Sequence, residues 1–326
     1  MERYILTMIR TFIYQTPGKD HSDKIVFGLV LITLFAAFGT CYYWYIHAPK
    51  KNATVKIISP LVNDVGRMLG LKKDSAGLKL AIDRSLEGSA GTYGIVINNL
   101  TTDQHYYHLE DRRFQTASIY KLWVMAEAFQ EIQEGRLKED EVLSEEIPTL
   151  NEKFHIASGD AELTEGVVRH TVTDALEKMV VYSDNYSALL LTARVKVSNL
   201  QTFLEENHFK DSSTGQPPVT TANDVALFFE KLYNGELADD VYTAKMLDLL
   251  KRQAHNDKLP KYLPDGIVMA HKTGEMDTFA HDGGIVYSPK GDYIIVVLSE
   301  SKATSGASDR IGQISQAAYE YFQKAD

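Results

Sequence analysis

The order of strand-like and helix-like segments limits the folds open to residues 76–326. Strand-type runs occur near residues 92–110 and again over 266–301, and helical patterns fill the region between them. Two further helical segments begin and end this region, from residue 76 and over residues 308–323. Segments with one apolar face are stable only when they bury that face against another layer. We therefore expect a sheet covered by the terminal helices, with an inserted helical lobe.

A long uncharged segment precedes this region. Residues 25–46, IVFGLVLITLFAAFGTCYYWYI, contain no Asp, Glu, Lys or Arg. A helix of this length spans a bilayer, and the aromatic residues at its end are typical of a membrane interface. We expect a cytoplasmic segment over 1–24, an uncleaved transmembrane anchor over 25–47, a juxtamembrane spacer over 48–75 and a catalytic domain over 76–326.

Composition excludes several classes of function. The formal net charge of −10 argues against nucleic acid as the main partner. Cys41 is the only cysteine, so neither an intrachain disulfide nor a cysteine-based zinc site is possible. No metallo-hydrolase motif and no glycine loop for phosphate is present, and we expect no metal and no cofactor.

A serine and a lysine one helical turn apart form the first candidate site. Ser118 and Lys121 lie where a polar, turn-prone stretch meets a long apolar helical pattern, and we expect Thr116 to cap that helix. Side chains three apart share a helix face, so the Ser118 hydroxyl and the Lys121 amine can meet. A lysine whose pKa is lowered by burial and a second cation can act as a base toward serine.

Two more short motifs follow in order. Residues 183–185 read Ser-Asp-Asn at the expected end of a helix, and residues 272–274 read Lys-Thr-Gly on an expected strand. Together with the Ser-x-x-Lys of residues 118–121, they form the signature of class A β-lactamases and penicillin-binding proteins. The sequence around the second and third motifs resembles the class A branch most. The resemblance covers roughly residues 76–326 and implies a β-lactamase/transpeptidase-like α/β fold, three-layered α-β-α with an antiparallel sheet, plus an all-helical lobe.

The resemblance also implies catalytic roles. Ser118 would attack an acyl carbonyl and form an acyl-enzyme, with Lys121 helping to remove its proton. Ser183 would relay a proton toward the leaving nitrogen. The backbone N–H groups of Ser118 and Glu275 would form the oxyanion hole.

Substrate-binding roles are implied for the remaining motif residues. Asn185 would hold the substrate amide and position Lys121. Lys272 would attract a substrate carboxylate and keep Lys121 neutral, and Thr273 would hydrogen-bond that carboxylate. Gly274 completes the strand motif between these residues and Glu275.

One part of the class A pattern is missing. That family carries a glutamate, in a loop after the Ser-Asp-Asn helix, that activates the deacylating water. The corresponding residues 209–221 read FKDSSTGQPPVTT and contain no glutamate; Asp211 and Gln216 are the residues there that could hold a water. We expect the acyl-enzyme to be hydrolysed slowly.

Three functions therefore stay open. The first is a serine hydrolase that cleaves the amide of a β-lactam. The second is a D-alanyl-D-alanine carboxypeptidase or transpeptidase acting on peptidoglycan stem peptides. The third is a module that binds penicillin or wall fragments without turnover. The substrates of all three functions lie outside the cytoplasm. Lys and Arg residues are balanced on the two sides of the apolar segment, so they do not indicate its orientation. We therefore place the N-terminus inside the cytoplasm and the catalytic domain outside it because of the substrates.

Overall fold

The structure is a computed structural model and describes residues 76–102 and 104–324 of the 326-residue chain. The predicted anchor at 25–47, with the segments on either side of it, lies outside the described residues. Within those residues, no helix combines the length and the apolar character that crossing a membrane requires.

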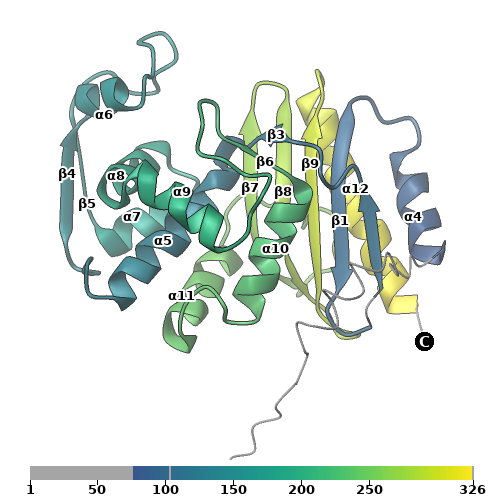
Figure 1. The fold of residues 1–326 in the computed structure, drawn as a ribbon. Helices are drawn as coiled ribbons and strands as arrows, with labels where there is room; N and C mark the ends of the chain where they lie inside the picture. The colour runs from purple at the N-terminus through teal and green to yellow at the C-terminus, as the bar shows by residue number, and fades with distance from the viewer. Residues whose placement is uncertain (1–75, 103, 325–326) are drawn as a thin grey trace, which may run out of the picture. The chain divides into compact units, whose positions relative to one another are not determined.

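Five antiparallel strands form the main sheet, in the order β2-β1-β9-β8-β7. The central strand β9 is apolar and almost wholly buried, as expected for a strand covered on both faces. The sheet joins strands from both ends of the described region, as the sequence predicted (Figure 1). Its strands are β1 (Thr92–Asn99), β2 (His105–His108), β7 (Val268–Met276), β8 (Phe279–Tyr287) and β9 (Tyr293–Glu300).

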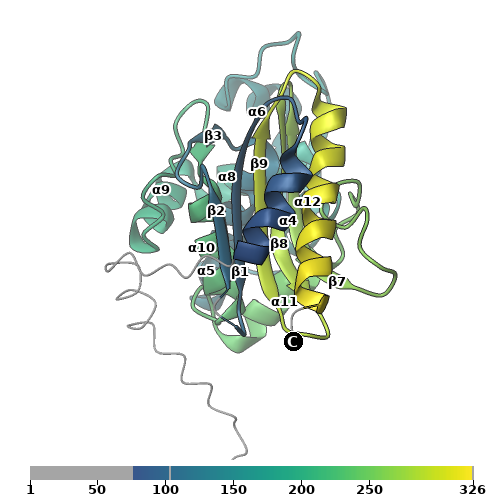
Figure 2. The same cartoon turned by 90° about the vertical axis from the view of Figure 1, so that its right-hand side faces the viewer.

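Two helices cover one face of the sheet. They are α4 (Ala76–Leu86) and α12 (Thr304–Lys324), which pack side by side (Figure 2). On α12, Ile311, Ile314, Ala318 and Phe322 recur at helical spacing and are buried in the core beneath the sheet. The helix begins four residues before the predicted start.

The remaining helices lie on the other side of the sheet and form the helical lobe beside β7 (Figure 1). Helices α10 and α11 contact the sheet itself, α10 against β1, β8 and β9 and α11 against β7. The three-layer α/β fold with an antiparallel sheet and a helical lobe is therefore confirmed. The helices are α5 (Lys121–Gln133), α6 (Ile147–Lys153), α7 (Val172–Val181), α8 (Asn185–Val195), α9 (Val197–Glu206), α10 (Ala222–Tyr233) and α11 (Asp240–Lys251).

Residues 138–170 are largely polar, and they form a two-stranded sheet and a short helix. Strands β4 (Val142–Glu146) and β5 (Val167–Thr171) pair with each other, and α6 lies between them in sequence. Each strand buries a single side chain, Leu143 or Val168, and the sequences VLSEE and VVRHT do not alternate apolar and polar residues as a half-buried strand does.

Candidate active site

Ser118 lies in a short 3₁₀ turn, η1 (Ala117–Tyr120), and α5 starts directly after it at Lys121. Ala117 has a positive φ of 43° as the chain enters the turn. Thr116 occupies the N-cap position of this turn, as predicted, but its hydroxyl donates to the Ala117 carbonyl at 3.1 Å and caps no N–H group. The Thr116 carbonyl instead accepts from the N–H of Ile119 at 3.0 Å. Ser118 is thus held by backbone geometry, half-buried at the start of α5.

The strand β7 lies against this turn because residue 274 has no side chain. A Cβ on Gly274 would meet Ile119 Cγ1 and the Thr116 carbonyl oxygen at 3.1 Å and the Ser118 nitrogen at 3.3 Å. Such contacts are tighter than nearly all that real side chains make. The glycine therefore lets the strand edge approach the Ser118 N–H group, and Glu275 follows it directly in the strand. This places both predicted oxyanion-hole residues on adjoining backbone segments.

Lys121 is buried at the base of the site and contacts the Ser-Asp-Asn turn. Its Nζ donates to the Ser183 carbonyl at 2.6 Å, to Asn185 Oδ1 at 2.7 Å and to Ser183 Oγ at 3.3 Å. Burial lowers the pKa of Lys121 to about 8, against the opposing charges of Asp184 and Glu162. A lysine with this pKa is partly neutral near neutral pH, as a general base must be.

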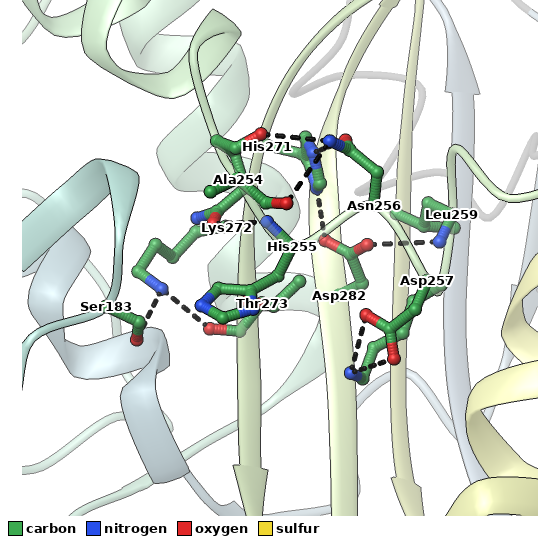
Figure 3. Close-up of polar contacts among 12 residues, drawn as sticks. Ser183, Ala254, His255, Asn256, Asp257, Leu259, His271, Lys272, Thr273 and Asp282 are labelled. Carbon is green, nitrogen blue, oxygen red and sulfur yellow. Dashed lines mark hydrogen bonds and ion pairs between the residues drawn. The ribbon is translucent and has the colours of Figure 1, made fainter.

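Lys272 approaches Ser183 from the strand side. Its Nζ donates to Ser183 Oγ at 3.0 Å and to the carbonyl of Thr273 at 2.9 Å (Figure 3). Burial, together with the nearby charge of Lys121, holds the pKa of Lys272 well below its usual value. The Ser183 hydroxyl therefore lies within hydrogen-bonding distance of two amines, and this arrangement can pass a proton from one side of the site to the other.

Asn185 connects Lys121 to a carboxylate that the sequence did not identify. Its Oδ1 accepts from Lys121, and its Nδ2 donates to Glu162 Oε1 at 2.5 Å. Asp184 caps α8 by accepting from the N–H of Ser187 at 2.7 Å, which fixes Asn185 at the first position of the helix. Glu162 belongs to a polar loop with no motif or periodicity, so nothing in the sequence pointed to it.

The loop over 209–221 contacts the chain just before the nucleophile. The N–H of Thr116 donates to the Pro218 carbonyl at 3.0 Å, and the short strand β6 (Val219–Thr220) pairs with β3 (Phe114–Gln115). Asp211, one of the two residues considered for holding a water, forms an ion pair with Arg113 at 2.9 Å. For the described residues, the hydrogen bonds of Lys121 lead to Ser183 and Asn185 and to no carboxylate of this loop.

A buried lysine lies beside the end of β7 and was also missed. The side chain of Lys258 is only 3% exposed, and its Nζ donates to Glu275 Oε2 at 2.9 Å and to Asp257 Oδ2 at 3.2 Å. Burial opposes the charged form, but the hydrogen bond that Lys258 donates to Glu275 and the charge of Asp257 raise the pKa of Lys258. A single lysine in a polar stretch gives no sequence signal for such a position.

The loop that carries Lys258 also supports the Ser-Asp-Asn turn. The N–H of Ala254 donates to the Val181 carbonyl at 2.9 Å, and the Gln253 side chain donates to the Val180 carbonyl at 2.9 Å. Figure 3 shows the labelled residues of this loop, Ala254 to Leu259, lying across the strands that carry His271 and Asp282, with Ser183 to one side. The loop thus joins the two sides of the site.

The two histidines beside the Lys-Thr-Gly motif are structural. His271 Nδ1 lies 2.9 Å from Asp282 Oδ1 and its Nε2 lies 3.2 Å from Asn256 Oδ1, so it ties β7 to β8 and to the loop (Figure 3). His281 is fully buried, donates to the Gln115 carbonyl at 2.8 Å and accepts from the N–H of Ser299 at 3.0 Å. Burial lowers the pKa of His281 to about 4, so the ring is neutral. Among the described residues, no group of three His, Cys, Asp or Glu side chains is placed to hold a metal ion.

The three motifs therefore meet at one place: a serine at a helix start, two buried lysines around a second serine, and backbone N–H groups beside the nucleophile. This is the geometry of a serine acyl-transfer site on a β-lactamase/transpeptidase-like fold. The model of the β-lactamase enzyme family matches residues 77–322. The chain belongs to the β-lactamase enzyme family, whose members are serine hydrolases of this type.

Solved structures show the same fold. PBP-A is 24% identical with a TM-score of 0.70, and the match covers 78% of this chain and 98% of PBP-A. A β-lactamase from Sphaerobacter thermophilus is 22% identical with a TM-score of 0.67, covering 77% and 98%. The TLA-1 extended-spectrum β-lactamase is 20% identical with a TM-score of 0.65, covering 76% and 98%. A comparison with curated proteins found no match.

Proposed function

We propose that the protein is a serine hydrolase that is acylated on Ser118 by a β-lactam and releases the acyl group slowly. The observation that carries this proposal is the convergence of Lys121 and Lys272 on the Ser183 hydroxyl, at 3.3 and 3.0 Å. That arrangement supplies both a base for the nucleophile and an acid for the leaving group. A mutant of PBP-A, a structural neighbour, has been crystallised as an acyl-enzyme complex with penicillin G.

The acylation step uses the groups described above. Ser118 Oγ forms a bond to the carbonyl carbon of the lactam, and its proton passes to neutral Lys121. The carbonyl electron pair moves to oxygen, next to the N–H groups of Ser118 and Glu275. When the C–N bond breaks, Ser183 gives its proton to the leaving nitrogen and receives one from a lysine ammonium group.

Slow deacylation follows from the carboxylates near the site. No glutamate occurs in residues 209–221, and Asp211 is held by Arg113. Glu162 reaches the site from another loop, but its carboxylate accepts a hydrogen bond from Asn185 and its side chain is exposed to solvent. Water attack on the ester thus lacks the strong, oriented base on which fast turnover depends.

The experiment is to mix the full chain with a chromogenic β-lactam and to follow colour release and intact mass together. We expect one equivalent of adduct to form quickly, with colour then continuing slowly. Ser118→Ala is the control and should give neither signal. Rapid steady turnover by the wild type would contradict slow deacylation, and adduct on the Ser118→Ala variant would contradict the assignment of the nucleophile.

A D-alanyl-D-alanine peptidase or transpeptidase acting on peptidoglycan stem peptides is the second candidate. It is favoured by the same lack of glutamate in 209–221, because an acceptor amine can release the acyl group where water is slow. Incubation with a D-alanyl-D-alanine peptide, with and without an acceptor amine, separates the two: release of D-alanine that depends on Ser118 favours the peptidase. In both cases we propose that the catalytic domain lies outside the cytoplasm, held by an anchor over residues 25–47.

A further inference from the structure

A buried cation next to the site is covered by carboxylates of the chain itself. Lys258 is 3% exposed at its side chain, while its partners Glu275 and Asp257 are 57% and 60% exposed. The ion pairs therefore lie at the surface end of a buried ammonium group. An anionic ligand that approaches Lys258 meets these two carboxylates first.

The position of this ion pair along β7 relates it to the substrate. Successive side chains of a strand point to opposite faces, and Gly274 faces the turn that holds Ser118. Thr273 and Glu275 therefore project on the other side, toward the loop that carries Lys258. The family resemblance implies that Thr273 binds the carboxylate of the substrate, and that carboxylate would then lie on the same side of the strand as Glu275.

The charged side chains around Lys258 at this end of the strand have a net negative formal charge. Lys258 contributes one positive charge and Asp257 and Glu275 contribute two negative charges, a formal sum of −1. The pKa of Lys272 is also held below its usual value, by burial and by the charge of Lys121. A substrate carboxylate at Thr273 is therefore attracted less than the number of lysines suggests.

We propose that Glu275 is a specificity-determining residue whose carboxylate neutralises Lys258 and so reduces the preference of the site for substrates that carry an ionised carboxylate beside Thr273. This inference rests on the proposed function. Replacing Glu275 with glutamine keeps a hydrogen-bond acceptor for Lys258 but removes the negative charge, so the lysine becomes available to an anionic substrate. Replacing Lys258 with glutamine leaves both carboxylates without a cation, so the site attracts an anionic substrate less.

The test compares penicillin G with its methyl ester, which lacks the ionised carboxylate. The second-order acylation rate constant of the full chain is measured for each compound by intact mass, and their ratio, acid over ester, cancels most other effects of a substitution. We expect the ratio to rise about fivefold in Glu275→Gln and to fall about fivefold in Lys258→Gln. Glu320→Gln, which removes an equally exposed carboxylate from a lysine pair on α12, should leave the ratio unchanged.

The outcomes separate this inference from the proposed function. A ratio that is the same in the wild type and in Glu275→Gln overturns the inference, even if both compounds acylate Ser118. Absence of adduct with either compound on folded wild-type protein overturns the proposed function and the inference with it. Because Lys258 is buried, its substitution can also destabilise the fold. Glu275 is exposed, so the ratio measured for Glu275→Gln tests the inference by itself.

Discussion

Lys272 Nζ donates a hydrogen bond to Ser183 Oγ at 3.0 Å, which links the edge strand β7 to the turn between α7 and α8. Ser183 has a positive φ of 58°, an uncommon conformation for a residue with a side chain. The turn is supported by the loop after α11 through the Val180 and Val181 carbonyls. The sheet and the helical lobe thus each contribute one side of the proposed proton path, and in the proposed function acylation depends on how the two parts fit.

The rate of acylation should rise with pH until Lys121 is neutral. Lys121 must be unprotonated to accept the proton of Ser118, and its pKa of about 8 lies below the usual 10.5. We expect the second-order acylation constant to increase about tenfold per pH unit below about pH 7.5 and to level off above pH 8. Intact mass measured from pH 5.5 to 9 with penicillin G checks this. A flat profile over that range would exclude Lys121 as the titrating base.

Glu162, which belongs to none of the three motifs, should influence the pH dependence of acylation. Its negative charge raises the pKa of Lys121, and its carboxylate accepts from Asn185 Nδ2. In Glu162→Gln, the acid limb of the acylation profile should therefore move to lower pH, by about 0.3 units because the residue is exposed. Glu165→Gln, in the same loop, is the matched control and should leave the limb in place. A shift to higher pH in Glu162→Gln would show that the carboxylate acts in another way.

Gly274 should be needed for catalysis more than for stability. In Gly274→Ala, the new methyl group would push β7 away from η1, because three atoms lie within 3.3 Å of its position. The displaced N–H group of Glu275 would stabilise the oxyanion poorly, and we expect acylation to slow by about a hundredfold. Gly159→Ala, where nothing lies within 4 Å, is the control. Acylation at the wild-type rate by a folded Gly274→Ala protein would contradict the close approach of the strand.

Much of the fold could be predicted because its signals are local. The strands around β9 have long apolar runs, and α12 repeats its apolar residues at helical spacing. Strands β4 and β5 were missed because each buries one side chain. The predicted segments before residue 76 lie outside the described residues and stay predictions.

The site could be predicted only in part because its contacts are distant in sequence. Ser118 and Lys121 are one turn apart, yet the hydrogen bonds of Lys121 reach Ser183 and Asn185, more than sixty residues away. Those partners followed from the resemblance to a known family. Glu162 and Lys258 belong to polar loops, and hydrogen bonds or ion pairs to one or two partners leave no pattern in a sequence.

A buried carboxylate on α5 should make stability depend on pH. Glu127 is 6% exposed and lies one turn from Glu131 on the same helix. Burial, with the charge of Glu131, raises the pKa of Glu127 from 4.5 to about 7 in the folded protein. The folded state therefore binds a proton that the unfolded chain has released between these values, so the free energy of unfolding falls as pH rises from about 4.5 through 7.

Glu127→Gln removes this titration. We expect the variant to be more stable than the wild type by about 1–2 kcal/mol at pH 8, where the buried carboxylate is ionised, and about equal to it near pH 4.5. Denaturant unfolding of both proteins at the two pH values measures the difference. Glu152→Gln, an exposed carboxylate on α6, is the control and should show no such dependence. A stability gain that is the same at both pH values would mean that Glu127 is unfavourable for reasons of packing and not of charge.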